Sequence, residues 1–470
     1  MQTDLVRKRL AVAVMLLPVL LAVACSSPST GQTATSGPAT IVPPGGRASA
    51  TDWLQYHGNA ARSGNVAGLP AAGRLSIAWS RHLGGAVYGQ PLVIGDTVVA
   101  ATQADQVYGL LRSTGAVLWH TRVGTPLPLN RQPCGNVNPL GVTGTGIYDP
   151  QTELVYFVAQ DGRTVHRLTG LRVSDGKIVV SRNVPSPDHE PFYDQQRGAL
   201  AMARGHIYVV FGGHFGDCGP YIGSVVAMPA TGRGPIWSYR VPTARQAGIW
   251  ASGGPVVSAN ATVYVSDGNG AVTKGPYDGS DAVIALTPRL KRVGIFAPTD
   301  WRTLSANDLD LGSMSPALLS DGRILQVGKS GVGYLLNASH LGGVGGQLAR
   351  GPVCDAFGGA AVSDRIVYVP CQGDGLTAVD TARTRIKVLW RAASGTSGSP
   401  VVGGGAVWVA NPYLGILYEL SPGTGKVRQR ISLHVQVSIG DQLPDFVSPS
   451  LSGGLVLIGT MTGVVAVSGA

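Results

Sequence analysis

Charge is scarce in this sequence. Asp, Glu, Lys and Arg together make up 13% of the 470 residues, whereas hydrophobic residues make up 44%. Such a chain is not of the charged, weakly hydrophobic kind that stays unfolded, and it can bury a sizeable core. Long 3.6-residue apolar periodicity is missing after residue 50, which excludes a mainly helical fold. Turn-forming residues are abundant instead, with 67 Gly and 31 Pro, so we expect many short strands joined by tight turns.

Familiar catalytic and metal-binding motifs are also missing. There is no GxSxG elbow, no CxxC or CxxCH spacing, and the nine His residues lack the spacing of metal ligands. The segment starting at His189 begins like HExxH, but its fifth residue is Tyr193 and Pro191 would disturb the required helix. Residues 322–330 resemble a P-loop with one residue too many, and a strand pattern follows them instead of a helix. His206 and His214 are interpreted as surface residues of a hairpin.

The net charge of +10 is spread thinly, without a run of Lys or Arg in the body of the chain. We therefore expect no nucleic-acid module. A basic surface attracts anionic lipid or wall polymer, but the simpler interpretation, which we favour, is a solvated basic face.

The N-terminus has the pattern of an export signal. Arg7, Lys8 and Arg9 precede an apolar run over residues 10–24, which is shorter than the ~20 residues of a membrane span. The segment 21–27, Leu-Ala-Val-Ala-Cys-Ser-Ser, resembles a bacterial lipoprotein lipobox, with Ala22 where Leu is usual. The resemblance implies cleavage after residue 24 and lipidation of Cys25. The alternative is simple signal cleavage without a lipid.

We thus predict a signal peptide over 1–24, a flexible Ser/Thr/Pro/Gly tether over 25–50 and a folded body over 51–470. The protein is expected to be exported and held by its lipid on the outer face of the cell membrane, on the periplasmic or extracellular side.

Four cysteines remain in the body, and an exported chain can oxidise them. They are Cys134, Cys218, Cys354 and Cys371, for which three connectivities are possible. Cys354 and Cys371 flank a hairpin pattern, so we favour that pair, which leaves Cys134 with Cys218.

A repeat runs through the body. Each unit starts with a small residue or Pro followed by an apolar pair, and the starts are 40 to 61 residues apart, about the size of a four-stranded propeller blade. The eight starts are Pro91, Gly146, Gly198, Pro255, Pro316, Ala360, Pro400 and Pro449. Later in the unit a Thr-Gly turn leads to a final strand that often carries Trp, which is suited to fill the wedge between blades.

The ends of the body complement each other. Residues 75–79 look like a final strand whose earlier strands are missing, and the last unit ends near Val465 without its Trp strand. The predicted fold is therefore all-β: an eight-bladed β-propeller of four-stranded antiparallel blades, closed by pairing of its N- and C-terminal strands. An open array of sandwiches is the alternative.

The segment 107–119, which runs through Thr114-Gly115 to Trp119, resembles the repeat of the PQQ-like (pyrroloquinoline-quinone) β-propeller family. Thr377-Ala378-Val379-Asp380 is another copy. Residues 53–64, called here the opening segment, look like the start of exported members of that family. The resemblance covers about residues 51–470. It is specific for the fold and says little about function.

Two branches of the family imply different functions. Quinoprotein dehydrogenases hold PQQ and Ca²⁺ at the ring centre, with a catalytic Asp and an adjacent cysteine pair. This chain has no such pair and is shorter. The BamB-like branch consists of lipoproteins of outer-membrane barrel assembly. The predicted lipidation, the size and the blade number of this chain fit that branch only as architecture, because a role in barrel assembly requires an outer membrane.

Side chains just before the repeat starts are the candidate ligand-binding residues, because propeller ligands usually sit at one mouth of the channel. They are Arg197, Trp250, Asp308, Asp310, Asp355 and Asp445. Arg197 and Trp250 are suited to clamp a planar anion, and the aspartates to gather a hard cation. The alternative, which we favour, is that they cap turns. The oxygen-rich runs 267–270 and 278–281 are expected to be turns.

We therefore expect a non-catalytic envelope protein, monomeric, that binds a protein or polymer partner through its loops. No cofactor or metal and no catalytic residue is expected. The alternative is a PQQ- and Ca²⁺-dependent alcohol or polyol dehydrogenase.

Overall fold

The computed structural model describes residues 52–271, 274–382, 384–393, 395–435 and 441–469. The predicted signal peptide, Cys25 and the tether lie outside these residues and remain predictions. In the part of the chain that is described, no helix is both long and apolar enough to span a bilayer.

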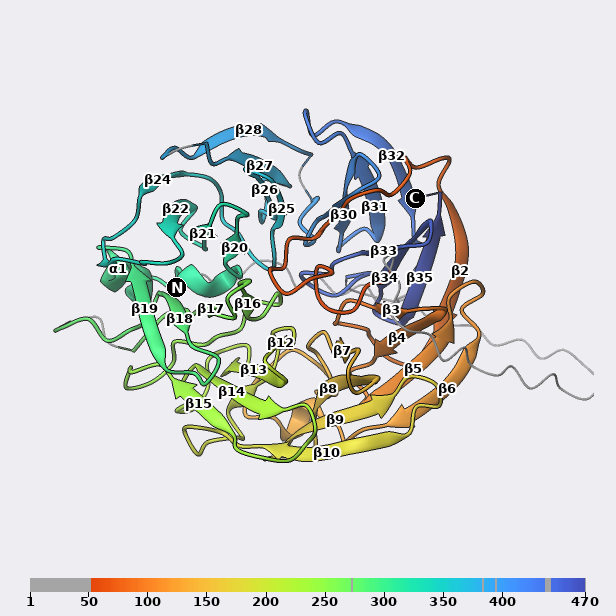
Figure 1. The fold of residues 1–470 in the computed structure, drawn as a ribbon, viewed down its shortest axis with the longest axis horizontal. Helices are drawn as coiled ribbons and strands as arrows, with labels where there is room; N and C mark the ends of the chain where they lie inside the picture. The colour runs from red at the N-terminus through yellow and green to blue at the C-terminus, as the bar shows by residue number, and fades with distance from the viewer. Residues whose placement is uncertain (1–51, 272–273, 383, 394, 436–440, 470) are drawn as a thin grey trace, which may run out of the picture. The chain divides into compact units, whose positions relative to one another are not determined.

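Eight antiparallel sheets follow one another around a ring (Figure 1). Blade 1 consists of β3 (Leu92–Ile94), β4 (Thr97–Ala101), β5 (Gln106–Leu111) and β6 (Val117–Arg122), and blade 2 of β7 (Ile147–Asp149), β8 (Leu154–Gln160), β9 (His166–Arg172) and β10 (Ile178–Val184). Blade 3 consists of β12 (Ala201–Ala203), β13 (His206–Gly213), β14 (Ser224–Pro229) and β15 (Trp237–Arg240), and blade 4 of β16 (Val256–Val257), β17 (Val263–Ser266), β18 (Val283–Leu286) and β19 (Arg292–Ala297).

Blade 5 consists of β20 (Ala317–Leu318), β21 (Arg323–Val327), β22 (Val332–Asn337) and β24 (Ala349–Pro352), and blade 6 of β25 (Ala361–Ser363), β26 (Ile366–Val369), β27 (Thr377–Asp380) and β28 (Lys387–Arg391). Blade 7 consists of β29 (Val401–Gly403), β30 (Ala406–Asn411), β31 (Ile416–Leu420) and β32 (Val427–Ser432), and blade 8 of β33 (Ser450–Ser452), β34 (Leu455–Gly459), β35 (Gly463–Ser468) and β2 (Ser76–His82).

Short additional elements decorate three blades and two loops. β1 (Asn65–Val66) joins blade 7, β11 (Asp194–Gln195) joins blade 3 and β23 (Gly343–Val344) joins blade 4. The helical elements described are α1 (Trp301–Ala306) and the 3-10 helices η1 (Leu129–Arg131) and η2 (Leu311–Ser313). The scarcity of helix matches the missing apolar periodicity.

The inner strands follow the predicted repeat starts. Seven of the eight begin one residue after the predicted start, and only β12 begins later, three residues after Gly198. Strands such as β3 and β4 are buried at every position, because both of their faces pack against neighbouring blades. Outer strands such as β6 alternate between exposed and covered positions, as expected for a sheet edge that faces solvent. The core therefore lies between the blades rather than in one central layer.

The ring is closed by pairing the beginning of the body with its end. β2 is hydrogen-bonded to β35, with Trp79 opposite Ala466 and Ser80 opposite Val465. In Figure 1 these two strands, at opposite ends of the colour scale, lie side by side. The predicted closure is confirmed, and it removes the free edge that an open array would have.

The predicted wedge role of Trp is seen at three blade junctions. The indole N–H groups of Trp79, Trp119 and Trp390 donate to the carbonyls of Arg112, Val173 and Pro422, each 2.8 to 2.9 Å away in the next blade. Each indole thus buries apolar area and satisfies its polar atom.

Both predicted disulfides form. Cys134 is bonded to Cys218, and Cys354 to Cys371. The second encloses the β25–β26 hairpin, as the sequence pattern indicated.

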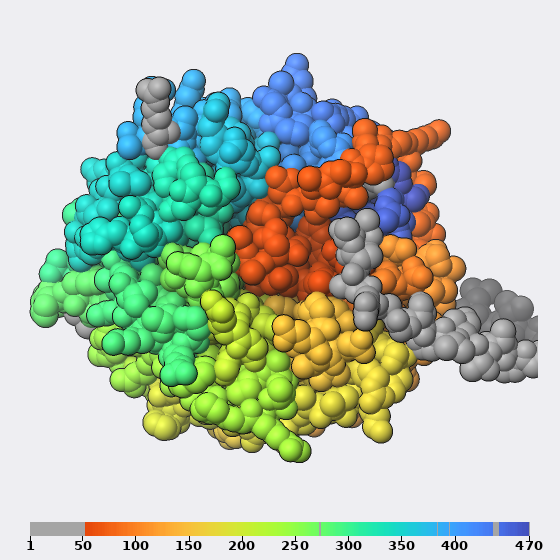
Figure 2. Space-filling model, in the orientation of Figure 1, coloured from red at the N-terminus to blue at the C-terminus, as the bar shows by residue number. Residues whose placement is uncertain are grey.

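The opening segment lies across one face of the ring (Figure 2). Its backbone is hydrogen-bonded to the inner strands of several blades, for example Trp53 to Val93 of blade 1 and Ala60 to Val257 of blade 4. Immediately after it, β1 pairs with β29 in parallel. The segment therefore covers the end of the central channel at which the inner strands turn back into the second strands.

Candidate functional site

The channel axis is filled by three side chains of the opening segment. Tyr56, His57 and Arg62 are at most 3% exposed. The rings of Tyr56 and His57 stack at 4.1 Å, and His57 Nε2 lies 3.1 Å from Ser448 Oγ of blade 8. Burial raises the pKa of Tyr56 and lowers the pKa of His57 to about 3, so both are neutral at physiological pH.

Arg62 ties this filling to the blades. Its guanidinium donates to the backbone carbonyls of Tyr56, Leu200 and Pro255 at 2.9, 2.6 and 3.2 Å. Among the described residues no carboxylate forms an ion pair with it. Burial therefore lowers the pKa of Arg62 to about 9, and neutral carbonyl dipoles hold the charge instead of a counter-ion.

All six predicted ligand residues lie at the opposite mouth of the ring, where the inner strands begin. Each precedes its inner strand in the sequence, and consecutive propeller blades run in the same direction. The contacts described below join them into one region, called here the aromatic mouth.

Arg197 is held at this mouth by carbonyls and rings. It donates to the backbone oxygens of Thr143 and Asp445 at 3.1 and 2.9 Å. Its guanidinium lies 5.6 Å from the ring centre of Tyr88 and 5.8 Å from that of Phe446. The guanidinium plane is therefore positioned by aromatic contacts from two blades.

Trp250 belongs to a trio of aromatic side chains. Its ring centre is 6.2 Å from that of Phe357 and 6.1 Å from that of Phe446, and the two Phe rings stack at 5.7 Å with an interplanar angle of 5°. All three side chains are partly exposed. Three blades thus contribute one ring each to a continuous apolar surface.

Lys329 connects this trio to the predicted aspartates. Its ammonium lies 5.8 Å from the Trp250 ring centre and forms ion pairs with Asp308 at 2.9 Å and Asp310 at 2.6 Å. Burial acts to lower the pKa of Lys329, but Asp310 and Asp308 raise it above its ordinary value. Burial raises the pKa of Asp310, and Lys329 opposes that change. One lysine therefore pairs with both carboxylates and offsets one of their two negative charges.

Asp355 lies at the edge of the mouth. Its backbone nitrogen is beside Gly331, and Gly331 belongs to the same turn as Lys329. Burial raises its pKa, and the charge of Lys329 acts against that change. Asp355, Asp445 and Asp308 are all exposed.

Sequence reasoning missed four residues of the aromatic mouth. Tyr88, Phe357 and Phe446 also precede inner strands, so the rule that selected Asp355 and Asp445 would have found them if it had been applied to rings. Lys329 lies in the turn after β21, within the P-loop-like run, and no pattern marked it as part of this mouth.

Two other expectations need comment. The runs 267–270 and 278–281 do lie between strands, but Asp267 and Asp281 are fully buried there. Burial raises the pKa of Asp281 to about 8 and that of Asp267 well above its usual range. The interpretation of His214 as a surface residue is wrong, because it is 2% exposed. Burial lowers its pKa to about 4.

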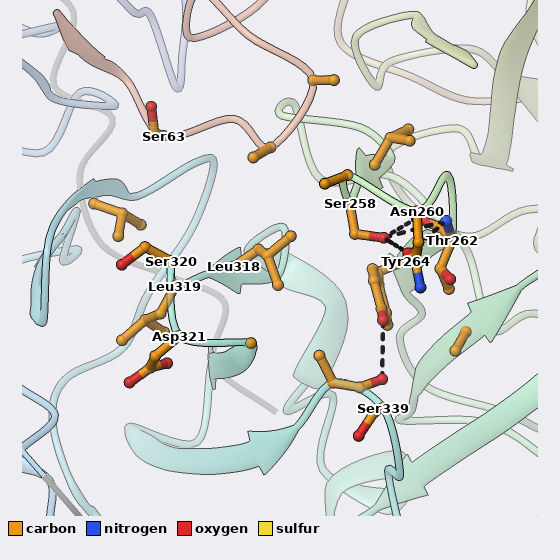
Figure 3. Close-up of a pocket in the computed structure, with 18 of the residues that line it drawn as sticks. Ser63, Ser258, Asn260, Thr262, Tyr264, Leu318, Leu319, Ser320, Asp321 and Ser339 are labelled. Carbon is orange, nitrogen blue, oxygen red and sulfur yellow. Dashed lines mark hydrogen bonds between the residues drawn. The ribbon is translucent and has the colours of Figure 1, made fainter. Parts of the chain in front are cut away.

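A large cavity lies on the face that carries the opening segment (Figure 3). Its volume is about 1050 Å³, and it lies between the turns of blades 4, 5 and 6 and the opening segment. Small, hydroxyl and amide side chains dominate its walls; among them are Ser63, Ser258, Asn260, Ser320 and Ser339, and Leu318 and Leu319 add an apolar part. The charged residues of its lining are Asp321 and Asp364.

The family comparison confirms the resemblance drawn from the repeat. Residues 60–275 match the family model described as "Outer membrane protein assembly factor BamB". No curated protein matches the chain.

Solved structures with the same fold cover most of the chain. Quinohemoprotein alcohol dehydrogenase ADHIIG from Pseudomonas putida HK5 is 12% identical with a TM-score of 0.68, over 89% of this chain and 80% of that one. BamB from Moraxella catarrhalis is 14% identical with a TM-score of 0.55, over 84% and 97%. A europium-containing methanol dehydrogenase is 15% identical with a TM-score of 0.65, over 88% and 91%. At these identities the likeness concerns the fold alone.

Proposed function

We propose that this chain, which carries the PQQ-like propeller fold, is a non-catalytic binding protein of the cell envelope that docks a partner protein at its aromatic mouth. The observation that carries the proposal is the convergence of Arg197, Trp250, Phe357 and Phe446 from separate blades on one partly exposed surface. Trp, Tyr and Arg are the residue types that dominate binding energy at protein interfaces.

The charges at the mouth favour a protein over an anionic polymer. Arg197 and Lys329 are both tied to neighbouring groups, and Asp308, Asp355 and Asp445 are exposed around them. Such a mixed surface repels a uniformly anionic chain and suits a partner of mixed charge. The channel behind the mouth is filled by Tyr56 and His57, so the partner would meet a surface rather than enter a pore.

The residues of this mouth do not fit PQQ with Ca²⁺. The Trp250 ring, on which a quinone would stack, already contacts Phe357, Phe446 and Lys329. Asp308 and Asp310 are paired with that lysine, and among the described residues no three His, Cys, Asp or Glu side chains are arranged to hold a metal. Ca²⁺ needs six or more oxygen ligands. This disagreement argues against the dehydrogenase alternative.

The test is capture of the partner from intact membranes with the full-length protein. The double variant Arg197→Ala/Trp250→Ala is expected to lose the partner that the wild type retains. Arg74→Ala is the matched control, because Arg74 is exposed and lies just before β2. Equal capture by the double variant, folded as judged by circular dichroism, would refute docking at this mouth.

A parallel assay addresses the alternative activity. Purified protein mixed with PQQ and Ca²⁺ is expected to show no dye-linked oxidation of alcohols or polyols. Turnover that disappears in Trp250→Ala would overturn the non-catalytic assignment.

The envelope location rests on the predicted lipid anchor. Mass spectrometry of the mature protein is expected to find a diacylglyceryl group on Cys25, and globomycin is expected to block maturation. If maturation proceeds in the presence of globomycin and Cys25 carries no lipid, the lipid anchor is refuted and the protein is secreted by simple signal cleavage.

A further inference from the structure

The opening segment binds the inner strands in a regular way. In five blades the second residue of the inner strand donates its backbone N–H to a carbonyl of this segment. The donor and acceptor pairs, at 2.6 to 2.9 Å, are Val93 and Trp53, Tyr148 and Leu54, Val257 and Ala60, Val362 and Ser63, and Val402 and Gly64. An inner strand has one neighbour in its own sheet, so alternate backbone groups face the axis and need another partner.

Blade 5 does not receive this partner. Its equivalent residue is Leu318, the second residue of β20, opposite Ile324. The next residue, Leu319, donates to Arg323 of β21 at 2.8 Å, so the alternation of an antiparallel ladder turns the Leu318 N–H away from β21. Within the described ranges, no hydrogen bond joins Leu318 to the opening segment, which passes from Ala60 at blade 4 to Ser63 at blade 6.

The uncovered edge faces the large cavity. Leu318 and Leu319 line it on one side, and Ala60 and Ser63 line it on the other. Its volume of about 1050 Å³ is at the upper end of the roughly 300–1,000 Å³ range of ligand-binding pockets. Figure 3 shows Ser63 on one side of the space and the segment from Leu318 to Asp321 on another.

We propose that this cavity binds an extended peptide segment of a partner protein, which pairs its backbone with Leu318 as the opening segment does with five other blades. The mode is strand addition to an unpaired sheet edge. The chain itself provides the precedent, because Val93 already pairs with Trp53 in an antiparallel bridge and β29 of blade 7 already pairs with β1.

The charge of the lining selects a basic peptide. Asp321 and Asp364 are its charged residues. Asp321 is paired with Arg323, whereas Asp364 is exposed and forms no ion pair among the residues that the structure describes. A Lys or Arg side chain next to the paired backbone would meet this carboxylate. A saccharide has no alternating carbonyl and N–H groups and cannot pair with the strand edge. Glycan binding in this cavity would therefore contradict the proposal, and the experiment below includes it as an outcome.

The probe is a fluorescein-labelled octapeptide of alternating Lys and Thr, titrated with the mature protein and followed by fluorescence anisotropy. We expect saturable binding, weaker binding of the Glu-Thr counterpart, and a loss of about tenfold when one alternate set of peptide N–H groups is methylated. Methylation of the other alternate set is expected to have little effect, since those groups face away from the edge.

Leu318→Pro removes the proposed donor without removing a bond to β21, because proline is tolerated where an edge N–H faces outward. Met202→Pro is the matched control, at the equivalent position of β12 in blade 3, outside the cavity. We expect Leu318→Pro to weaken peptide binding at least about tenfold, and Met202→Pro to bind like the wild type. Leu318→Pro should also lower the melting temperature, because the leucine side chain packs in the core between blades 4 and 5, so binding is compared at a temperature where circular dichroism shows both variants folded.

Three outcomes would overturn this proposal: no binding of the Lys-Thr peptide at millimolar concentration, equal binding by a folded Leu318→Pro variant, or displacement of the probe by a neutral hexasaccharide that binds wild type and Leu318→Pro alike. The double variant Arg197→Ala/Trp250→Ala lies at the opposite mouth and is expected to bind the peptide normally. Failure of the aromatic-mouth proposal and failure of this one are therefore separable.

Discussion

The indole of Trp79 closes over Gly115 of the next blade. A Cβ atom placed on Gly115 would lie 2.5 Å from Trp79 Cε3, and Gly115 has a φ of +67°, which side chains disfavour. The carbonyl of Gly115 accepts a hydrogen bond from Arg81 Nε at 2.7 Å, two residues after the tryptophan on the same outer strand. Because this junction joins blade 8 to blade 1, the Trp-Gly contact holds the ring where its two ends meet.

Gly115→Ala is therefore expected to destabilise the fold through two separable effects. Left-handed strain costs about 1–2 kcal/mol, and overpacking against Trp79 adds about 1–3 kcal/mol. Gly162→Ala is the matched control, because Gly162 has a φ of +74° but no heavy atom within 4 Å of its virtual Cβ. Urea unfolding should show a larger loss for Gly115→Ala. Equal losses would mean that the ring tolerates a wider junction here.

Much of this fold could be predicted because each repeat is marked by residues that determine turns and strand ends locally. Proline, glycine or alanine at each repeat start, Thr-Gly turns and outer-strand tryptophans predicted the blade number and strand order, and the incomplete units at the two ends predicted the closure. Both disulfides followed from cysteine count and one hairpin pattern. Blade 5 illustrates the limit: β23 leaves the blade order to pair with β19 of blade 4, and no periodicity marks a two-residue strand.

Arg62 should be essential for holding the opening segment. Replacement by Ala leaves the carbonyls of Tyr56, Leu200 and Pro255 buried without their donor, at a cost of about 1–3 kcal/mol for each unsatisfied group. We expect a lower melting temperature and faster proteolysis within residues 53–64. Arg74→Ala, at an exposed position, should leave both unchanged. Normal protease resistance of a destabilised Arg62→Ala variant would show that the segment is held by its backbone bonds alone.

The candidate sites were less predictable than the fold. The position before each inner strand selected Arg197, Trp250, Asp308, Asp310, Asp355 and Asp445, which lie at one mouth of the ring, and their role in binding stays a prediction. Their partners were not foreseen, since Lys329 comes from a different turn and its pairing with two aspartates depends on side-chain geometry. The cavity beside Leu318 depends on the path of the opening segment between blades 4 and 6, and no local pattern in the sequence encodes that path.

His57 should contribute to a loss of stability in acid. Burial lowers its pKa to about 3 in the folded protein, against 6.5 in an unfolded chain. Below pH 6.5 the unfolded chain therefore binds a proton that the folded protein does not, so stability falls as the pH falls from 6.5 towards 3. In His57→Gln the slope of unfolding free energy against pH should be smaller by up to about 1.4 kcal/mol per pH unit.

Urea midpoints between pH 7 and pH 4 measure this slope, and the exposed His82→Gln provides the control. The slope should not vanish in His57→Gln, because burial also lowers the pKa of His166 and His214 to about 4. Parallel curves for His57→Gln and the wild type would mean that His57 becomes protonated in the folded state.

Asp105 should act in the opposite direction. Its side chain is fully buried, and burial together with Asp161 raises its pKa to about 8, against the opposing effect of the Val142 backbone N–H. Between pH 3.8 and 8 the folded protein holds a proton that the unfolded chain has lost, so this group costs stability as the pH rises. Asp105→Asn does not titrate, and its stability advantage over the wild type should grow from pH 4 to pH 8 and then level off. Chemical unfolding at pH 5, 7 and 9 measures the difference, with the exposed Asp364→Asn as control. An Asn variant that is equally destabilised at all three pH values would show that the carboxyl makes a favourable contact in its ionised form, and that burial does not set its pKa.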